Sequence, residues 1–218
     1  MLQPFWRAEQ RLKEAAQHGF LYLTNYGMTA EDMTSFVSTI HDAIGPLSEE
    51  QRASLADGIA GYKPMGAEST AKLLNTGMLD DLCWKYTWLE TGGPAPDDLF
   101  KTKMQAYYSQ METIASTLLK ALARVFELDL GQLINDNQSV AGRGVLRFLN
   151  YEQVPDKFCH DEPRDVRMGA HPDLDILTLL YQQPSPNGVP SLQACIADSW
   201  VDVPPVVGRS CLLACWCI

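Results

Sequence analysis

Histidine and basic residues are scarce in this sequence. Its 218 residues include four histidines and 17 lysines or arginines, against 27 aspartates or glutamates, which gives a formal net charge of -10. The lysines and arginines form no cluster, and binding to phosphate groups requires a basic patch. We therefore expect neither a nucleic acid nor an anionic membrane among the partners.

Long apolar runs and a leader-like N-terminus are also lacking. No run approaches the ~20 apolar residues of a membrane-spanning helix, and the first residues lack the basic-then-apolar order of a signal peptide. We therefore expect a cytoplasmic protein. The length suits one domain with a substantial core, or at most two small ones, and the 46% content of hydrophobic residues is ordinary for a globular protein.

Cysteines are few for a disulfide-stabilised protein, and we expect most of the six to be buried thiols. The last three, Cys211, Cys215 and Cys217, form a Cys-x-x-x-Cys-x-Cys tail. This tail is either a site for a soft metal or a chance cluster. We favour chance, because no second pair of ligands lies at a zinc-site spacing.

Hydrophobic periodicity predicts helices first and strands later. Helices are expected over 4–17, from Thr29 through about 44, from Ser48, over 97–126 and at about 129–136. Strands are expected over 20–24, 145–151, 176–181, 191–196 and 200–205. This order favours helices packed outside a β-sandwich or barrel.

Residues 58–96 are rich in glycine and proline and have no clear period. Connections of this length are usually functional, so this segment is a candidate wall or lid over a pocket. The alternation of Trp84, Tyr86 and Trp88 equally suits an edge strand that packs its aromatic side chains on a core.

His171 and Asp173 are candidate metal ligands. An apolar run at 176–181 follows them and is typical of a buried strand. If the strand begins near His171, the imidazole and the carboxylate point to the same face. They would then form two thirds of the 2-His-1-carboxylate triad that binds iron(II) and leaves positions open. A lone His-x-Asp is more often a turn or a polar pair, so both interpretations stay open at this point.

Four blocks of sequence, spread over nearly the whole chain, resemble a known family. They are GFLYLTNYGMT at 19–29, ESTAKLLNTG at 68–77, LRFLNYEQVP at 146–155 and RMGAHPDLDILTLLYQQPSPNGVPSLQ at 167–193. In order and spacing they resemble the isopenicillin N synthase-like branch of the iron(II)/2-oxoglutarate oxygenases, and most of all the cephalosporin ring-expanding and hydroxylating enzymes. The last block is the specific one.

The resemblance implies a fold of the α+β or mainly β class, a double-stranded β-helix (jelly roll) with flanking helices. Residues 1–218 would form a single domain that is incomplete at its C-terminus. Within it, 1–137 would be mostly helical flank and lid, and 144–218 the start of the jelly-roll core.

The resemblance also implies a chemistry. Iron(II) would be bound by His171, Asp173 and a second histidine, with 2-oxoglutarate and O2 as cosubstrates and ascorbate as a supporting reductant. Succinate and carbon dioxide would be released while a small natural-product substrate is hydroxylated, desaturated or ring-expanded, as in the biosynthesis of antibiotics and other secondary metabolites.

Three further residues carry over by position. Met168 and Tyr151 would lie beside 2-oxoglutarate, and Arg147 would meet a substrate carboxylate. The alternative for Arg147 is a surface ion pair with an acidic residue. The ring-expanding enzymes have a second arginine where this sequence has Leu149, and a penicillin carboxylate would lose charge-assisted hydrogen bonds without it. A β-lactam is therefore disfavoured against a related natural product.

The sequence also departs from the family pattern near its end. No histidine follows Asp173, and neither the distal histidine nor the Arg-x-Ser that binds the far carboxylate of 2-oxoglutarate is present. After Gly208 the sequence RSCLLACWCI does not match. We expect this polypeptide to be truncated, unstable and inactive, with weakly bound iron and unpaired sheet edges. Two alternatives are a non-catalytic binding remnant and an isopenicillin N synthase-like oxidase that uses no 2-oxoglutarate, which would also need the second histidine.

Overall fold

The computed structural model describes residues 5–127, 144–158, 166–173, 177–188, 191–206 and 212–215. The chain forms two compact units. The first comprises residues 1–37, 113–136 and 173–218, and the second comprises 38–112 and 137–172. The helix predicted at 129–136 lies outside the described residues.

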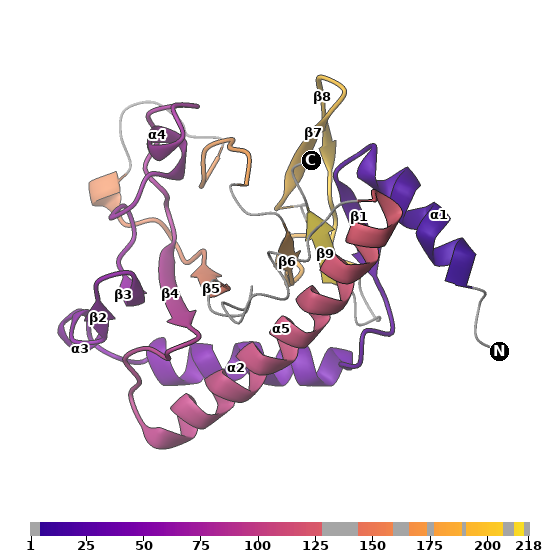
Figure 1. The fold of residues 1–218 in the computed structure, drawn as a ribbon. Helices are drawn as coiled ribbons and strands as arrows, with labels where there is room; N and C mark the ends of the chain where they lie inside the picture. Colours follow the sequence, from indigo (N-terminus) through magenta and orange to yellow (C-terminus); the bar gives the residue numbers. More distant parts are fainter. Residues whose placement is uncertain are drawn as a thin grey trace. The chain divides into compact units, whose positions relative to one another are not determined.

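The first unit combines helix α1 (Phe5–Ala16) with two small antiparallel sheets (Figure 1). One sheet has the order β1-β9-β6 and the other pairs β7 with β8. The strands are β1 (Phe20–Leu23), β6 (Thr178–Leu180), β7 (Gln193–Ile196), β8 (Ser199–Asp202) and β9 (Leu212–Cys215). The sequence predicted all of these elements except β9, which pairs with both of its neighbours in the first sheet.

A small core holds the β7–β8 hairpin in the first unit. The hairpin turns at Ala197 and Asp198, which both have positive φ, the conformation of a tight two-residue turn. Ala194 and Val203 are buried, and half-buried apolar side chains from β1 and β6 pack against them. Gln182 Nε2 donates to the Val203 carbonyl at 2.7 Å.

Two longer helices, α2 (Ala30–Ile44) and α5 (Asp98–Val125), contain the unit boundaries. The predicted capping box begins α2: the Thr29 N–H donates to Asp32 Oδ2 at 2.7 Å, and the Asp32 N–H donates to Thr29 Oγ1 at 3.1 Å. The hydrogen bond from the Thr29 backbone lowers the pKa of Asp32. Ile40 and Ile44 are fully buried, as the apolar stripe of this helix predicts.

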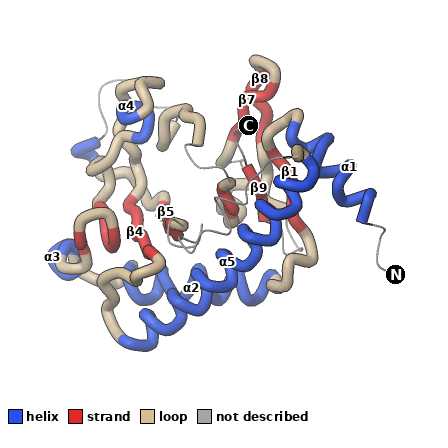
Figure 2. The backbone as a smooth tube through the Cα atoms, viewed as in Figure 1, coloured by secondary structure: helices blue, strands red, loops and turns tan. Residues whose placement is uncertain are grey.

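The second unit is built on an antiparallel sheet of order β2-β3-β4-β5, whose strands are labelled in Figure 1 and drawn in red in Figure 2. Its strands are β2 (Ala56–Asp57), β3 (Ala60–Lys63), β4 (Trp84–Leu89) and β5 (Val145–Asn150), and its short helices are α3 (Glu49–Ala53) and α4 (Thr70–Leu73). The alternative that 84–88 forms an edge strand is correct as to the strand but not as to the edge, because β4 pairs on both sides. Its side chains are buried on both faces from Trp84 to Trp88.

Aromatic side chains fill one face of β4. Trp84, Tyr86 and Trp88 alternate along the strand, as expected for residues that share a face. Trp84 packs against Phe148 of β5, and Tyr86 meets Phe100 of α5 edge-on, with ring centroids 5.4 Å apart in each pair. The part of α5 in the second unit therefore covers the aromatic face of the sheet.

The opposite face of β4 carries a buried ion cluster, formed by Glu68, Asp81 and Lys85. Lys85 Nζ lies 2.6 Å from Asp81 Oδ2 and 2.8 Å from Glu68 Oε2, and the side chains of Lys85 and Asp81 are only 3% and 1% exposed. Burial alone would lower the pKa of Lys85, but its hydrogen bonds to the two carboxylates raise the pKa above the ordinary value. Lys85 is therefore charged and fully paired at neutral pH.

Replacing Gly61 tests the packing of β3. Gly61 has φ +76° and an added Cβ would lie 1.8 Å from the Leu55 carbonyl oxygen. We expect Gly61→Ala to lower the unfolding free energy by at least about 2 kcal/mol, measured by chemical denaturation. Gly58→Ala is the matched control, because Gly58 also has positive φ but an added Cβ meets nothing within 4 Å. Equal losses in the two variants would contradict the predicted clash.

Replacing Lys85 tests the ion cluster. We expect Lys85→Met to cost about 3–5 kcal/mol, because it leaves two buried or half-buried carboxylates unpaired. Lys63→Met is the control. Lys63 lies directly opposite Lys85 in the register of β3 and β4, and its ammonium donates to the exposed Gly58 carbonyl. We expect it to cost less than about 1 kcal/mol.

The cluster also predicts a dependence of stability on pH. Since the folded-state pKa of Lys85 is raised, its contribution is complete below the unfolded value of 10.5 and is lost as pH rises from there through the folded-state value. The unfolding free energy of the wild type should therefore fall more steeply in this alkaline range than that of Lys85→Met. Parallel curves would contradict the assignment.

Candidate metal and cosubstrate site

The predicted metal ligands lie in a loop. Residues 166–173 contain no strand, and β6 begins at Thr178 (Figure 1). The condition that the strand begins near His171 is therefore not met, and strand alternation does not place His171 and Asp173. The two residues also belong to different units, because the boundary falls between Pro172 and Asp173.

The His171 ring is held by the backbone just before it. Its Nδ1 lies 2.8 Å from the Gly169 carbonyl oxygen, and the ring is half-buried. A carbonyl oxygen only accepts, so Nδ1 carries the proton in this hydrogen bond. In the neutral imidazole, Nε2 then has the lone pair. This tautomer is the one that metal-binding histidines adopt when a backbone carbonyl orients them.

The donor chemistry of the two predicted ligands fits iron(II), which imidazole nitrogen and carboxylate oxygen both bind. Asp173 is half-buried. Within the described parts of the chain, however, no group of three His, Cys, Asp or Glu side chains is close enough to hold a metal ion. The residues present supply two ligand types of the triad, and the third ligand is not among the described residues.

Hydrogen bonds hold the loop before His171 against residues 71–82 and against Glu152. The Leu82 N–H donates to the Arg167 carbonyl at 2.7 Å. The Arg167 guanidinium returns to the Leu82 carbonyl, with Nε at 2.9 Å, and also reaches the Glu152 carbonyl at 2.7 Å. Thr76 Oγ1 donates to the Ala170 carbonyl at 2.6 Å. His171 is therefore positioned by elements of the second unit.

Tyr151, a predicted cosubstrate residue, lies beside this loop. The Arg167 guanidinium carbon lies 5.7 Å from the centre of its ring, and the whole residue is half exposed. Burial of the hydroxyl raises the pKa of Tyr151, and the neighbouring Cys83 and Asp81 raise the pKa further. The phenol is therefore protonated at neutral pH and can donate a hydrogen bond to a carboxylate.

Cys83 and Met168 complete the surroundings of this loop. Burial raises the pKa of the Cys83 thiol to about 11, so it is a neutral thiol rather than a thiolate. Met168, the second predicted cosubstrate residue, is half-buried. It is next to Arg167 in the chain.

Arg147 lies on β5 with an exposed side chain, opposite Thr87 of β4. No hydrogen bond or ion pair joins its guanidinium to any residue that the structure describes. The alternative of a surface pair with an acidic side chain therefore has no support in these parts of the chain. Leu149 lies opposite Lys85, whose ammonium is already bound by two carboxylates. Lys85 cannot take over the role of the second arginine.

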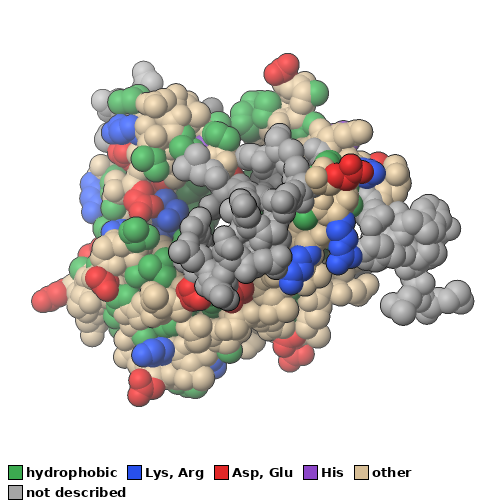
Figure 3. Space-filling view, viewed as in Figure 1, with side chains coloured by type: hydrophobic (Ala, Val, Ile, Leu, Met, Phe, Trp, Pro, Cys, Tyr) green, Lys and Arg blue, Asp and Glu red, His purple; other side chains and the backbone are tan. Residues whose placement is uncertain are grey.

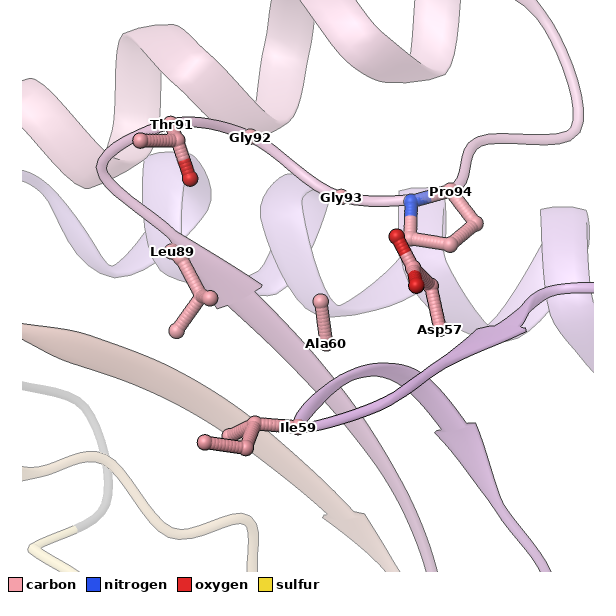
Figure 4. A pocket seen from close by; sticks show the side chains of 8 residues that line it. All are labelled: Asp57, Ile59, Ala60, Leu89, Thr91, Gly92, Gly93 and Pro94. Carbon is pink, nitrogen blue, oxygen red and sulfur yellow. The ribbon is translucent and has the colours of Figure 1, made fainter.

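A shallow pocket lies where β4 ends, away from the loop of His171, and contains none of the predicted site residues. It has a volume of about 520 Å³, between the β2–β3 turn and the loop that follows β4 (Figure 4). Its lining consists of Asp57, Ile59, Ala60, Leu89, Thr91, Gly92, Gly93 and Pro94. Asp57 is the charged side chain of this lining, and no other titratable group accompanies it there.

Sequence reasoning missed the residues that support the loop, namely Thr76, Asp81 and Lys85. One signal was present: a lysine stands between the aromatic residues of the strand Trp84–Leu89. A charged residue in a strand that is otherwise aromatic and apolar requires either solvent or a buried partner. Its partners lie four and 17 positions earlier in the chain.

Comparison with known proteins gives one family and a consistent set of relatives. Residues 144–215 match the model of the 2OG-Fe(II) oxygenase superfamily. The match continues past Gly208, so the interpretation that the family pattern ends there is wrong. The segment beyond Gly208 contains β9, which lies between β1 and β6.

Two of the curated relatives, each 27% identical to the chain, act in cephalosporin chemistry by name. Deacetoxycephalosporin C hydroxylase of Streptomyces clavuligerus aligns over 86% of this chain and 60% of its own length. Deacetoxycephalosporin C synthase of Amycolatopsis lactamdurans aligns over 88% and 62%. The chain thus spans about three fifths of the length of these relatives.

Solved structures share the fold of this chain. A 2OG-Fe(II) oxygenase family protein from Caulobacter crescentus superposes with a TM-score of 0.70 at 22% identity, over 98% of this chain and 70% of that one. The dioxygenase for auxin oxidation in rice superposes with a TM-score of 0.65 at 16% identity, over 96% and 66%. The jelly-roll type of fold predicted from the sequence is therefore confirmed, although the described strands form no closed barrel. The chain is thus similar to the 2OG-Fe(II) oxygenase superfamily over residues 144–215 and shares the fold of these solved structures.

Proposed function

We propose that the chain is part of an Fe(II)- and 2-oxoglutarate-dependent oxygenase that oxidises a small natural product bearing a carboxylate. The observation that carries this proposal is the His171 ring, whose Nδ1 is bound to a backbone carbonyl so that Nε2 has the lone pair. Asp173 follows two residues later and supplies the carboxylate ligand. The match to the superfamily, whose members use Fe(II) and 2-oxoglutarate, supports the same conclusion.

The chain's own residues have three roles in this proposal. His171 and Asp173 bind the metal. Tyr151 and Met168 line the position of 2-oxoglutarate, where the protonated phenol donates a hydrogen bond to a carboxylate oxygen. Arg147 binds the substrate carboxylate. When bound, Fe(II) with 2-oxoglutarate and O2 supplies the oxidising chemistry, and succinate and carbon dioxide are its by-products.

Charge and apolar surface support the substrate class. Arg147 is an exposed cation that binds no acid within the described residues, and a guanidinium of this kind forms a bidentate pair with a carboxylate. Leu73 and Met78, on the segment that holds the loop of His171, are 75% and 76% exposed. Hydrophobic side chains are visible at the surface over α4 (Figure 3). These features favour an apolar substrate with one carboxylate, and Leu149 disfavours a penicillin.

A second candidate is a binding protein without turnover. The ligand count favours it: within the described residues, no group of three His, Cys, Asp or Glu side chains could hold a metal ion. With one imidazole and one carboxylate the metal would be weakly held, and 2-oxoglutarate would not be consumed. An oxidase that uses no 2-oxoglutarate is a third outcome of the same experiment.

The metal assignment is tested with Mn(II) binding and with Fe(II)-dependent formation of succinate from 2-oxoglutarate. We expect His171→Ala to weaken Mn(II) binding and to lower succinate formation by at least about 100-fold, because a ligand is lost. His41→Ala is the control, because the His41 side chain is 62% exposed and lies on α2. Mn(II) binding without succinate formation in the wild type would favour the binding protein, and O2 uptake without 2-oxoglutarate would favour the oxidase. Equal Mn(II) binding in both variants and the wild type would remove His171 from the metal site.

The role of Arg147 is tested with a panel of natural-product carboxylates, β-lactam and other, each paired with its methyl ester. For any compound that stimulates succinate formation, we expect Arg147→Gln to lower kcat/KM by about 10- to 100-fold, as the loss of a charge-assisted pair allows. With the wild type, kcat/KM for the methyl ester should be lower than kcat/KM for the free acid by a similar factor. With Arg147→Gln, the acid and the ester should have equal kcat/KM. Lys101→Gln, on the exposed surface of α5, is the charge-matched control. Additive losses would show that Arg147 does not contact the carboxylate.

A further inference from the structure

The position of His171 depends on how closely its loop approaches α4. A Cβ added to Gly169 would lie 2.6 Å from the Ala71 Cβ, so the backbone at residue 169 packs directly on the helix. The carbonyl of this same glycine accepts the hydrogen bond from His171 Nδ1. A shift of α4 would therefore move the group that orients the imidazole.

Thr76 adds a second connection one residue from the histidine. Its Oγ1 donates to the Ala170 carbonyl at 2.6 Å, and its N–H donates to the Ala71 carbonyl at 2.8 Å. Thr76 thus links α4 to the peptide unit between Ala170 and His171. The two contacts, at Ala71 and at Thr76, leave this short stretch of backbone little freedom to rotate.

Asp81 holds the beginning of α4. Its Oδ2 accepts from Thr70 Oγ1 at 2.6 Å and from the Thr70 N–H at 3.2 Å, as well as from Lys85. The Asp81 N–H donates to the Glu68 carbonyl at 2.8 Å. The carboxylate is 1% exposed, so these hydrogen bonds are made away from water. Asp81 thereby joins β4 to the helix that supports the loop.

We propose that Thr76 and Asp81 are positioning residues for His171, and that through α4 they select the Nδ1–H tautomer of its imidazole. The inference rests on the proposed function only in naming Nε2 as the metal-binding atom. The tautomer itself is a property of the metal-free protein. The role of these residues can therefore fail while the metal assignment stands, and the converse also holds.

The experiment is a ¹⁵N NMR measurement of the imidazole nitrogens in the metal-free full chain, at an alkaline pH above which the imidazole signals no longer change. The four histidines are assigned from variants that lack each in turn. In the wild type we expect His171 to show a protonated Nδ1 and an unprotonated Nε2. The reverse pattern in the wild type would overturn the proposal at once.

Thr76→Val is the decisive variant, because it keeps the shape of the side chain and removes the hydroxyl that reaches Ala170. We expect the ratio of the Nδ1–H to the Nε2–H tautomer at His171 to fall by about fivefold, the factor that one lost hydrogen bond of ~1 kcal/mol gives. Thr102→Val is the matched control, because Thr102 Oγ1 also donates to a backbone carbonyl, that of Asp98 on α5, at 2.8 Å. An unchanged ratio in Thr76→Val, or an equal change in Thr102→Val, would overturn the role of Thr76.

Asp81→Asn tests the more distant contact. The amide keeps the size of the carboxylate but pairs poorly with Lys85 and Thr70, so we expect the tautomer ratio to move in the same direction. If this variant does not fold, the milder Thr70→Val, which removes only the hydroxyl that donates to Asp81, takes its place. A folded Asp81→Asn or Thr70→Val with the wild-type ratio would confine positioning to Thr76 and overturn the role of Asp81.

Discussion

The buried ammonium of Lys85 constrains the whole second unit. A charge on an interior strand is tolerated only if it is paired and its hydrogen bonds are satisfied. Its partners Asp81 and Glu68 come from the segment before β4, so that segment must fold back over the sheet. α4 lies within it, and the loop of His171 packs on α4. The ion cluster is therefore the first step in a chain of contacts that ends at a predicted metal ligand.

The same cluster explains a limit of sequence-based prediction. The alternation of Trp84, Tyr86 and Trp88 identifies a strand and its aromatic face, but Lys85 and Thr87 between them look like a solvent-facing set. That pattern is shared by an edge strand and by an interior strand whose other face is covered by polar partners. Only the pairing with both β3 and β5 distinguishes the interior strand from the edge strand. The pairing with β5 joins β4 to residues about 60 positions later in the chain.

Other elements differ in how far local signals determine them. The capping boxes at Thr29 and Ser48 and the apolar stripe of α2 act within four residues, so the predicted helix starts were confirmed. β9 has no such signal: it is a short stretch of a cysteine-rich tail that becomes a strand because β1 and β6 pair with it on both sides. At the site, the motif identifies His171, but the Gly169–Ala71 approach and the Thr76 hydrogen bond join residues nearly 100 positions apart. No local pattern encodes contacts at that separation.

Charge on the face of the sheet opposite the aromatic residues is distributed unequally, and this bears on substrate choice. Lys85 is neutralised by two carboxylates, whereas Arg147, opposite Thr87, binds no acid within the described residues. One guanidinium beside the apolar Leu149 suits a single carboxylate attached to an apolar body. A ligand with a second anionic group would find no second available cation on these two strands, because the ammonium of Lys85 is buried and already binds two carboxylates. If Arg147 binds the substrate carboxylate as proposed, this arrangement favours a substrate with one carboxylate over a substrate with two.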